Sequence, residues 1–326
     1  MPITGPSSYL QVIDEVAGHW AEVNAIHALL VRLPDNTTLT LVQFEGVRGS
    51  LQTQQNVVQA RLTAQQIARS SINTKKAALL AQFALFTGML DAYFENTDFI
   101  DSRPLAPTPT AGQAAFTEPM IDMMALWEEI NAGPAPSGIT LPLVLADGTT
   151  QGGFASSLSA LQFAYADERK KGVKVSVSRS KRNRLQDKAQ SAIRLYREAV
   201  PPLMVASPEL VDSMPRLSPL PGHTPERVNA SAMYQPPNQT KIVHDASTDA
   251  TVSHYELRGH AGDEYSDEDA VVIASHEPGA VMEFVTAFGL TQPGARAAFK
   301  VFVVLTTGNE SGSAGMVVER PLALAA

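Results

Sequence analysis

A seven-residue phrase containing a tryptophan occurs twice in the chain, as HWAEVNA at 19–25 and as LWEEINA at 126–132. The chain has 326 residues and only these two tryptophans. Around each one, apolar residues recur with the same 3-4-3 spacing, which is typical of one buried face of an α-helix. The sequence therefore predicts the same amphipathic helix twice, with both tryptophans in hydrophobic cores. The eight residues are Ile13, Val16, Trp20, Val23, Met120, Met123, Trp127 and Ile130.

Further landmarks follow both tryptophans in the same order. Each helix leads to a short apolar segment and a turn sequence, Asp35-Asn36-Thr37-Thr38 in the first copy and Asp147-Gly148-Thr149-Thr150 in the second. Asp, Asn and Gly tolerate the backbone conformations of tight turns, so a small hairpin is expected at both places. Each copy ends at a proline-containing exit, 101–104 and 212–215. We interpret this agreement as a tandem duplication, with one unit at 1–112 and a second at 113–225 that packs with it.

Between the turn and the exit, each copy contains a long helical pattern with a polar stretch in its middle. The apolar spacing runs from Phe44 to about Arg69 and resumes at Leu79 in the first copy; in the second it runs from Phe154 to about Lys174 and resumes at Leu185. We interpret each copy as a long helical hairpin of the kind found in helical bundles. The predicted turn of each hairpin lies in the polar stretch.

The pattern changes to alternating apolar and polar residues after about residue 225. Short β-rich runs occur at 241–243, 253–258, 270–273 and 299–305, separated by turn residues, which favours an antiparallel sandwich. The chain is thus predicted to combine a tandemly duplicated α-helical bundle with a C-terminal β-domain. No long apolar stretch predicts a membrane span, and the N-terminus has no ordinary secretion signal. We therefore expect a cytoplasmic protein or one exported by a non-classical route.

Residues 226–321 resemble a fibronectin type III domain, with 322–326 as a tail. The resemblance rests on YELRG at 255–259, on Leu290 before Gln292-Pro293-Gly294, and on FKVFVVLTTGNESGSAG at 299–315. Two positions depart from the family pattern, because His244 stands where a core tryptophan is usual and Phe299 where a corner tyrosine is usual. The resemblance implies a binding or spacing module without catalytic residues. The helical region resembles no family that we can name.

The sequence shows no motif that predicts catalysis or a cofactor. It has no cysteine, which excludes disulfides and thiolate chemistry. Nucleophile-elbow, phosphate-loop and dinucleotide-binding patterns do not occur. The seven histidines show no metal-ligand spacing; His19 and His27 lie along one helix, and His244 is expected to replace a core aromatic residue. We accordingly expect no enzyme activity, no cofactor and no metal site.

The charges are distributed unevenly along the chain. The formal net charge is −2 for 1–112, +1 for 113–225 and −7 for 226–326, which together give the overall −8. Basic residues gather at the predicted tip of the second hairpin, and acidic residues gather in one loop after YELRG. The chain is acidic overall and has few aromatic residues near its basic cluster, which argues against nucleic-acid binding. The candidate interaction residues are Arg169, Lys170, Lys171, Lys174, Arg179, Lys181, Arg182, Arg184, Asp263, Glu264, Asp267, Glu268 and Asp269.

These two charged clusters permit several interpretations. They can be ordinary solvated surfaces, or the acidic loop of one subunit can bind the basic tip of another, which would build rings or filaments. A calcium site in the acidic loop does not fit the EF-hand spacing. Our first hypothesis is a non-enzymatic structural or interaction protein that self-assembles or acts as a scaffold, so its expected partner is a second copy or another protein.

Two other hypotheses stay open at this point. The first is a monomeric adhesion or ligand-binding protein whose β-domain recognises a carbohydrate or protein, which exposed tyrosines at 234, 255 or 265 would favour. The second is an enzyme with a site near His223 and His254, for which the spacing gives no support. Apolar stripes left open on the helices would instead favour assembly.

Overall fold

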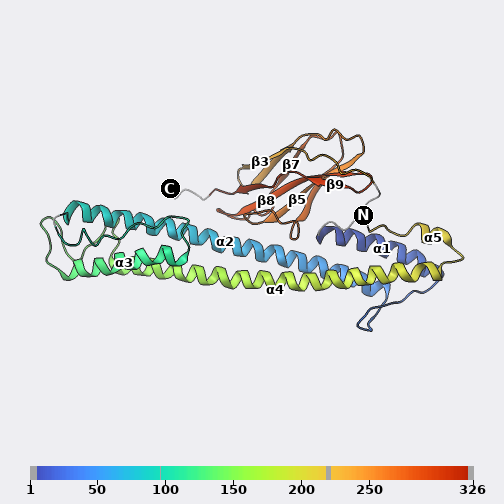
Figure 1. The fold of residues 1–326 in the computed structure, drawn as a ribbon, viewed down its shortest axis with the longest axis horizontal. Helices are drawn as coiled ribbons and strands as arrows, with labels where there is room; N and C mark the ends of the chain where they lie inside the picture. Colours follow the sequence, from blue (N-terminus) through green and yellow to red (C-terminus); the bar gives the residue numbers. More distant parts are fainter. Residues whose placement is uncertain (1–5, 96, 218–221, 322–326) are drawn as a thin grey trace. The chain divides into compact units, whose positions relative to one another are not determined.

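The structure is a computed structural model that describes residues 6–95, 97–217 and 222–321. The predicted tail at 322–326 lies outside these residues. Helices dominate the first part of the chain and antiparallel strands the last (Figure 1). The first seven elements are α1 (Pro6–Ile26), β1 (Val31–Arg32), β2 (Thr38–Leu39), α2 (Leu41–Tyr93), α3 (Gln113–Ala132), α4 (Gln151–Leu203) and α5 (Pro208–Asp212).

The predicted helical hairpins are wrong, because α2 and α4 are each one continuous helix of 53 residues. The polar stretches that we expected to turn are helical. Their hydroxyl groups bond within the same helix: Thr74 donates to the carbonyl of Ser70, and Ser178 donates to that of Lys174. A hydroxyl group that donates to the carbonyl oxygen four residues earlier has its hydrogen bond within the helix, so the helix can continue through it. The basic residues therefore lie along α4 and not at a hairpin tip.

The chain folds into two compact units whose bounds differ from those of the predicted repeats. The first unit contains 1–66 and 173–326, and the second contains 67–172. Each unit therefore includes part of α2 and part of α4. The repeats predicted at 1–112 and 113–225 and the compact units are different divisions of the same chain.

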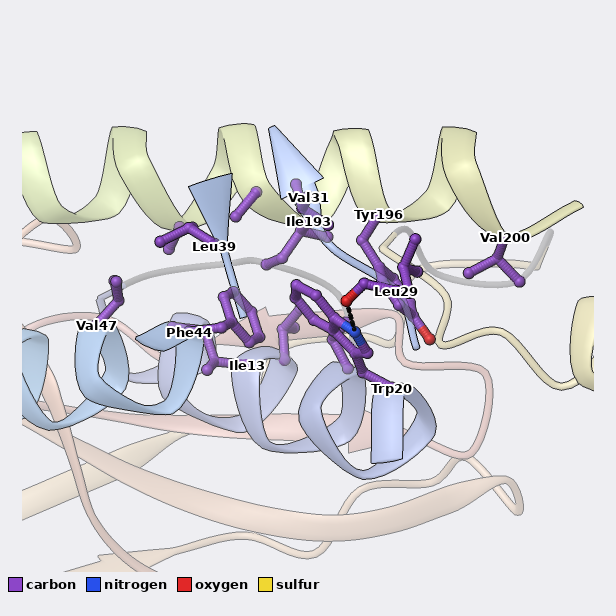
Figure 2. Packing of buried hydrophobic residues seen from close by; sticks show 14 of the residues in the cluster. Ile13, Trp20, Leu29, Val31, Leu39, Phe44, Val47, Ile193, Tyr196 and Val200 are labelled. Atoms are coloured by element: carbon purple, nitrogen blue, oxygen red, sulfur yellow. Dashed lines mark hydrogen bonds between the residues drawn. The ribbon is translucent and has the colours of Figure 1, made fainter. Parts of the chain in front are cut away.

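The core of the first unit forms around Trp20, which is fully buried (Figure 2). The indole ring packs against Phe44 of α2 and Tyr196 of α4, with ring centroids 5.5 and 4.9 Å away. Its Nε1 donates a hydrogen bond of 3.3 Å to the carbonyl oxygen of Leu29. The predicted apolar face of α1 is confirmed, since Ile13, Val16 and Val23 share this core.

The core of the second unit forms around Trp127 in the same way. Trp127 is fully buried, packs against Phe154 and Phe86, and donates from Nε1 to the carbonyl oxygen of Leu143 at 3.2 Å. The predicted face of α3 is confirmed, because its apolar residues are buried in this cluster. Both tryptophans are core residues, as expected from the sequence.

Both predicted turns are also confirmed. Asn36 and Gly148 adopt positive φ angles of 65° and 83°, which suit Asn and Gly. Asp35 accepts a hydrogen bond from the backbone of Thr37, and Asp147 accepts one from the backbone of Thr149, both at 2.9 Å. The first turn joins β1 to β2, and the second closes an isolated bridge between residues 144 and 150.

The C-terminal strands form two antiparallel sheets. They are β3 (Ala230–Gln235), β4 (Gln239–His244), β5 (Val252–Ala261), β6 (Val271–His276), β7 (Glu283–Thr286), β8 (Arg296–Leu305), β9 (Glu310–Gly312) and β10 (Met316–Glu319). One sheet has the order β3-β4-β7, and the other has β10-β8-β5-β6 with β9 paired to β8. Both sheets contribute to one hydrophobic cluster, with Ile242 and Phe284 from the first and Leu257, Phe299 and Val301 from the second. The predicted β-rich runs lie in β4, β5 and β8, and the run at 270–273 begins one residue before β6.

Candidate functional site: a buried charged clasp

The loop between β5 and β6 is joined to α4 by a group of ion pairs around a buried centre, which we call the clasp. It consists of Arg179, Arg182, Glu268 and Asp269 within the first compact unit. The side chains of Arg182 and Asp269 are both 1% exposed, and Nη1 of Arg182 lies 2.6 Å from Oδ1 of Asp269. Arg179 pairs with the other carboxylate oxygen of Asp269, and Glu268 lies 3.0 Å from Nη2 of Arg182.

Arg182 takes a core position on α4. Val175, Ser178 and Arg182 follow the 3-4 spacing of a buried face, and Val175 is buried in one cluster with Val58 and Leu62 of α2 and the sheet residue Ala261. The loop residue Asp269 is held by a turn, in which its N–H and that of Ala270 donate to the carbonyl oxygen of Ser266.

The guanidinium of Arg182 has a hydrogen-bond acceptor for each of its five N–H groups. Nε and Nη2 donate to Oδ1 of Asn183, Nη2 also donates to Oε1 of Glu268, and Nη1 donates to Oδ1 of Asp269 and the carbonyl oxygen of Glu268. Burying a charge costs free energy unless it is paired and fully hydrogen-bonded. The geometry around Arg182 meets that condition, so this arginine holds the loop in one specific position.

Other polar atoms near the clasp have no hydrogen-bond partner among the described residues. Gln59 of α2 donates from Nε2 to the carbonyl oxygen of Asp269 at 2.6 Å, but its Oε1 is buried and unpartnered. Nε of Arg179 and Nε2 of His260 are also buried and unpartnered. A buried polar atom without a hydrogen bond costs free energy. The hydrogen bonding of the clasp is therefore less complete around Gln59, Arg179 and His260 than around Arg182.

The remaining candidate residues lie outside the clasp. Arg169 donates to Gln113 at 2.9 Å, and Lys171 pairs with Asp167 one turn earlier. In the acidic loop, Asp263 pairs with Arg296 and Asp267 with Lys300, both at 3.5 Å. Among these nine residues, the exposed side chains are Arg169, Lys170, Lys174, Lys181, Arg184, Asp263, Glu264 and Asp267. The structure thus brings four of the thirteen candidates together as the clasp, within a single chain.

Sequence reasoning missed a second charged network on the five-stranded sheet. Arg258 binds Glu256 at 2.7 Å and Glu310 at 2.6 Å, and its guanidinium lies 3.9 Å from the centre of the Phe302 ring. Burial alone would lower the pKa of Arg258, but the bonds to Glu310 and Glu256 outweigh it and raise that pKa. Burial works against the charge of Glu256 too, yet His254 and Arg258 lower its pKa. The alternation along β5 places residues 254, 256 and 258 on one face, and that signal could have revealed the network.

The residues that would have favoured the other hypotheses are engaged in the fold. Tyr255 is buried, Tyr234 is half-buried, and the hydroxyl of Tyr265 is buried. His223 pairs with Asp249, and Nε2 of His254 lies 3.1 Å from Glu256. In the described part of the chain, no group of three or more metal-binding side chains occurs. Among the helices of the same residues, none is long and apolar enough to cross a membrane.

Comparisons with known proteins give no family for this chain. No family model and no curated protein matches it. Among solved structures, a fibronectin type III-like protein from Clostridium thermocellum aligns over its whole length with 32% of this chain, at 16% identity and a TM-score of 0.24. A structure described as a myokine aligns over 99% of its length with 30% of this chain, at 11% identity and a TM-score of 0.25.

Enzymes are also among the matched structures. The pectate lyase PelI from Erwinia chrysanthemi aligns over 28% of its length with 28% of this chain, at 15% identity and a TM-score of 0.24. The chain therefore covers a little more than a quarter of that enzyme. At these TM-scores none of the matches supports a conclusion about function.

Proposed function

We propose that this chain is a non-enzymatic structural or interaction protein that assembles through its charged surfaces. The proposal rests on the charge that stays exposed on α4 beside the closed clasp. Lys174, Val177, Lys181 and Arg184 follow a 3-4 spacing and are all exposed, so they share one face of the helix. We call these four residues the basic face.

The occupant we propose for the basic face is the acidic loop of a second copy. The region 226–326 carries a net charge of −7, and Glu264 and Asp267 are exposed in the loop outside the clasp. Because the two surfaces are different, each copy can use both at once, and such a head-to-tail contact continues into rings or filaments. Exposed charge pairs of this kind mainly set association rate and specificity, and salt screens them.

We further propose that the helical region arose by duplication. The helices α2 and α4 have the same length, and each begins and ends 110 positions from its counterpart. Asn24 accepts a hydrogen bond from the backbone of Leu29, and Asn131 accepts one from the backbone of Leu143, at 2.9 and 2.7 Å. These matched contacts, together with those of the tryptophans and the turns, support one ancestral unit.

The C-terminal domain is, in this proposal, a fibronectin type III-like sandwich that serves as the display or linking module. Two antiparallel sheets that share one hydrophobic cluster support this architecture. The ring centroid of His244 lies 5.6 Å from that of Phe284 and 4.8 Å from that of Tyr255. This packing supports its role in place of a core aromatic residue.

The proposed assembly is tested by light scattering of the full chain at low and high salt, with negative-stain imaging of the same samples. The expected result is a salt-sensitive assembly that Lys181→Glu or Arg184→Glu disperses. Arg194→Glu is the matched control, because it makes the same charge change on another exposed part of α4. Arg182 is unsuitable for this test because it is buried in the clasp. A monomer at every salt and protein concentration would refute assembly.

A further inference from the structure

Two histidines from different sheets meet inside the C-terminal domain. His244 is the last residue of β4 and His276 is the last residue of β6. Their Nε2 atoms lie 3.0 Å apart, which is a hydrogen-bond distance. His244 is buried and His276 is half-buried. This contact is independent of the clasp and of the basic face.

The two imidazoles face each other end to end. Their ring centroids are 5.2 Å apart and their planes differ by 18°. The centroid separation exceeds the nitrogen separation by about the width of one imidazole ring, so both Nε2 atoms lie between the rings. A hydrogen bond between the two nitrogens is therefore nearly straight.

The other ring nitrogens are engaged in matching contacts. Nδ1 of His244 lies 2.9 Å from the carbonyl oxygen of Asp245, and Nδ1 of His276 lies 3.1 Å from that of Glu277. A carbonyl oxygen only accepts, so Nδ1 carries the proton in both rings when these bonds form. Two neutral rings in that tautomer would point two Nε2 lone pairs at each other. One additional proton between the nitrogens satisfies every contact.

We propose that His244 and His276 together form a site that binds one proton, shared between their Nε2 atoms, and that this proton fastens β6 to β4. One Nε2 atom donates this proton and the other accepts it. A zinc ion in line between the nitrogens would need about 4 Å between them, so the observed separation fits a proton.

The surroundings favour a single positive charge over two. Burial, followed by the charge of His276, lowers the pKa of His244, despite the opposing effect of Asp245. Tyr255 and Phe284 contribute only their rings, because the tyrosine hydroxyl accepts from the backbone of Ser247. Among other charged groups near these strands, Glu283 pairs with Lys241. Helix α1 also contacts β6. The acidic side chains of α1, Asp14, Glu15 and Glu22, are exposed.

The site predicts two opposite pH effects on stability. The hydrogen bond between the two Nε2 atoms forms only in the folded pair and needs the first proton, so stability should increase as the pH falls through this step. The second proton binds less tightly, because the pKa of His244 is lowered from 6.5, so stability decreases as the pH falls further below that value. The strongest link between the sheets therefore lies between the two steps.

The test is a titration of the full-length protein, labelled with ¹⁵N at histidine, by two-bond ¹H–¹⁵N correlation after treatment with EDTA. We expect protonated Nδ1 in both rings and two coupled steps that are at least about one pH unit apart. His27, which is exposed, is the internal reference. A single step at the same pH for both rings, or a neutral Nε2–H tautomer throughout, would overturn the proposal.

Two variants separate the proton site from simple packing. His276→Gln keeps an N–H that can donate to His244 but cannot carry charge, so β6 stays attached and the two-step pH dependence of thermal unfolding disappears. His244→Phe places an apolar ring in the core and should fold with the same loss of pH dependence. Retention of the wild-type pH profile in either variant contradicts the proposal. A zinc-dependent rise in unfolding temperature that His276→Gln abolishes would identify a metal site and also overturn it.

Discussion

The two tryptophan cores differ in the chemistry of matching positions. In the first unit, His19 accepts a hydrogen bond of 2.6 Å from Tyr196 and donates from Nε2 to the carbonyl oxygen of Leu210 at 2.7 Å. In the second unit, Leu126 and Phe86 stand at the corresponding positions and are buried. The first unit thus has a hydrogen-bonded pair where the second has an apolar pair, and either mixture would leave a polar group without its partner.

The same contrast extends to the middle of the long helices. Arg182 of α4 corresponds to Ile72 of α2, 110 positions earlier, and Ile72 is buried in the apolar core of the second unit. The first unit can use an arginine there because the acidic loop supplies Asp269 and Glu268. The comparison teaches that polar core residues occur where another part of the chain completes their hydrogen bonds.

Trp20→Ala and Trp127→Ala should have the largest effects. Each removes a fully buried ring and leaves a cavity, so each is expected to reduce the free energy of unfolding by about 3–5 kcal/mol. Urea unfolding of the full chain, followed by circular dichroism, measures both. A loss below about 1 kcal/mol in one variant alone would break the comparison between the two cores.

Arg182→Ile introduces the residue of the second unit into the clasp. It leaves Asp269 with Arg179 as its only arginine partner among the described residues and with Nε2 of His260 3.8 Å away, and we expect a loss of about 3 kcal/mol. The double variant Arg182→Ile with Asp269→Leu should recover most of this loss, since no buried charge is then left unpaired. Equal losses in the single and double variants, measured by urea unfolding, would contradict the role of the ion pair.

Tyr196→Phe introduces the apolar partner of the second unit into the first. The loss of the hydroxyl bond to His19 should cost about 1 kcal/mol. Adding His19→Leu tests the exchange as a set, and the two changes together should cost less than the sum of the single changes. A strictly additive result in a double-mutant cycle would show that the two side chains act independently.

The turn carboxylates should show the smallest effect and the closest agreement. The backbone N–H of Thr37 lowers the pKa of Asp35 below 3.8, and that of Thr149 lowers the pKa of Asp147 in the same way. Their contributions to stability are present above the ordinary value and are lost as the pH falls through the lowered one. Carbon-detected NMR titration should find both values depressed. An ordinary value at one site would indicate that its turn differs.

Periodicity predicted the cores well and the middle of the helices poorly. The 3-4-3 face around each tryptophan follows from helix geometry, and the alternating runs follow from strand geometry, so both were readable from the sequence. The polar stretches resembled turns, because hydroxyl bonds such as that of Ser178 to Lys174 leave no trace in the pattern. Neither polar stretch, 69–79 or 174–185, contains a Pro or Gly. The absence of these helix-ending residues was the better guide there.

The charged residues of the clasp were identifiable, but their partners were not. Arg182 and Asp269 are 87 positions apart, and only the fold brings them together. Net charge suggested complementarity without distinguishing a contact within one chain from a contact between chains. The pair of His244 and His276 could not be predicted for the same reason, since the two residues are 32 positions apart and only the fold brings them together.

Strand β6 lies at the edge of its sheet, where an unpaired row of backbone groups can recruit a strand from another molecule. Its six residues begin two positions after Asp269 and end at His276, so the strand is anchored just before its start and at its end. Anchoring limits how far the edge can peel away and expose its hydrogen-bonding groups. Loosening either anchor would then lead to aggregation by strand addition before the domain loses its core.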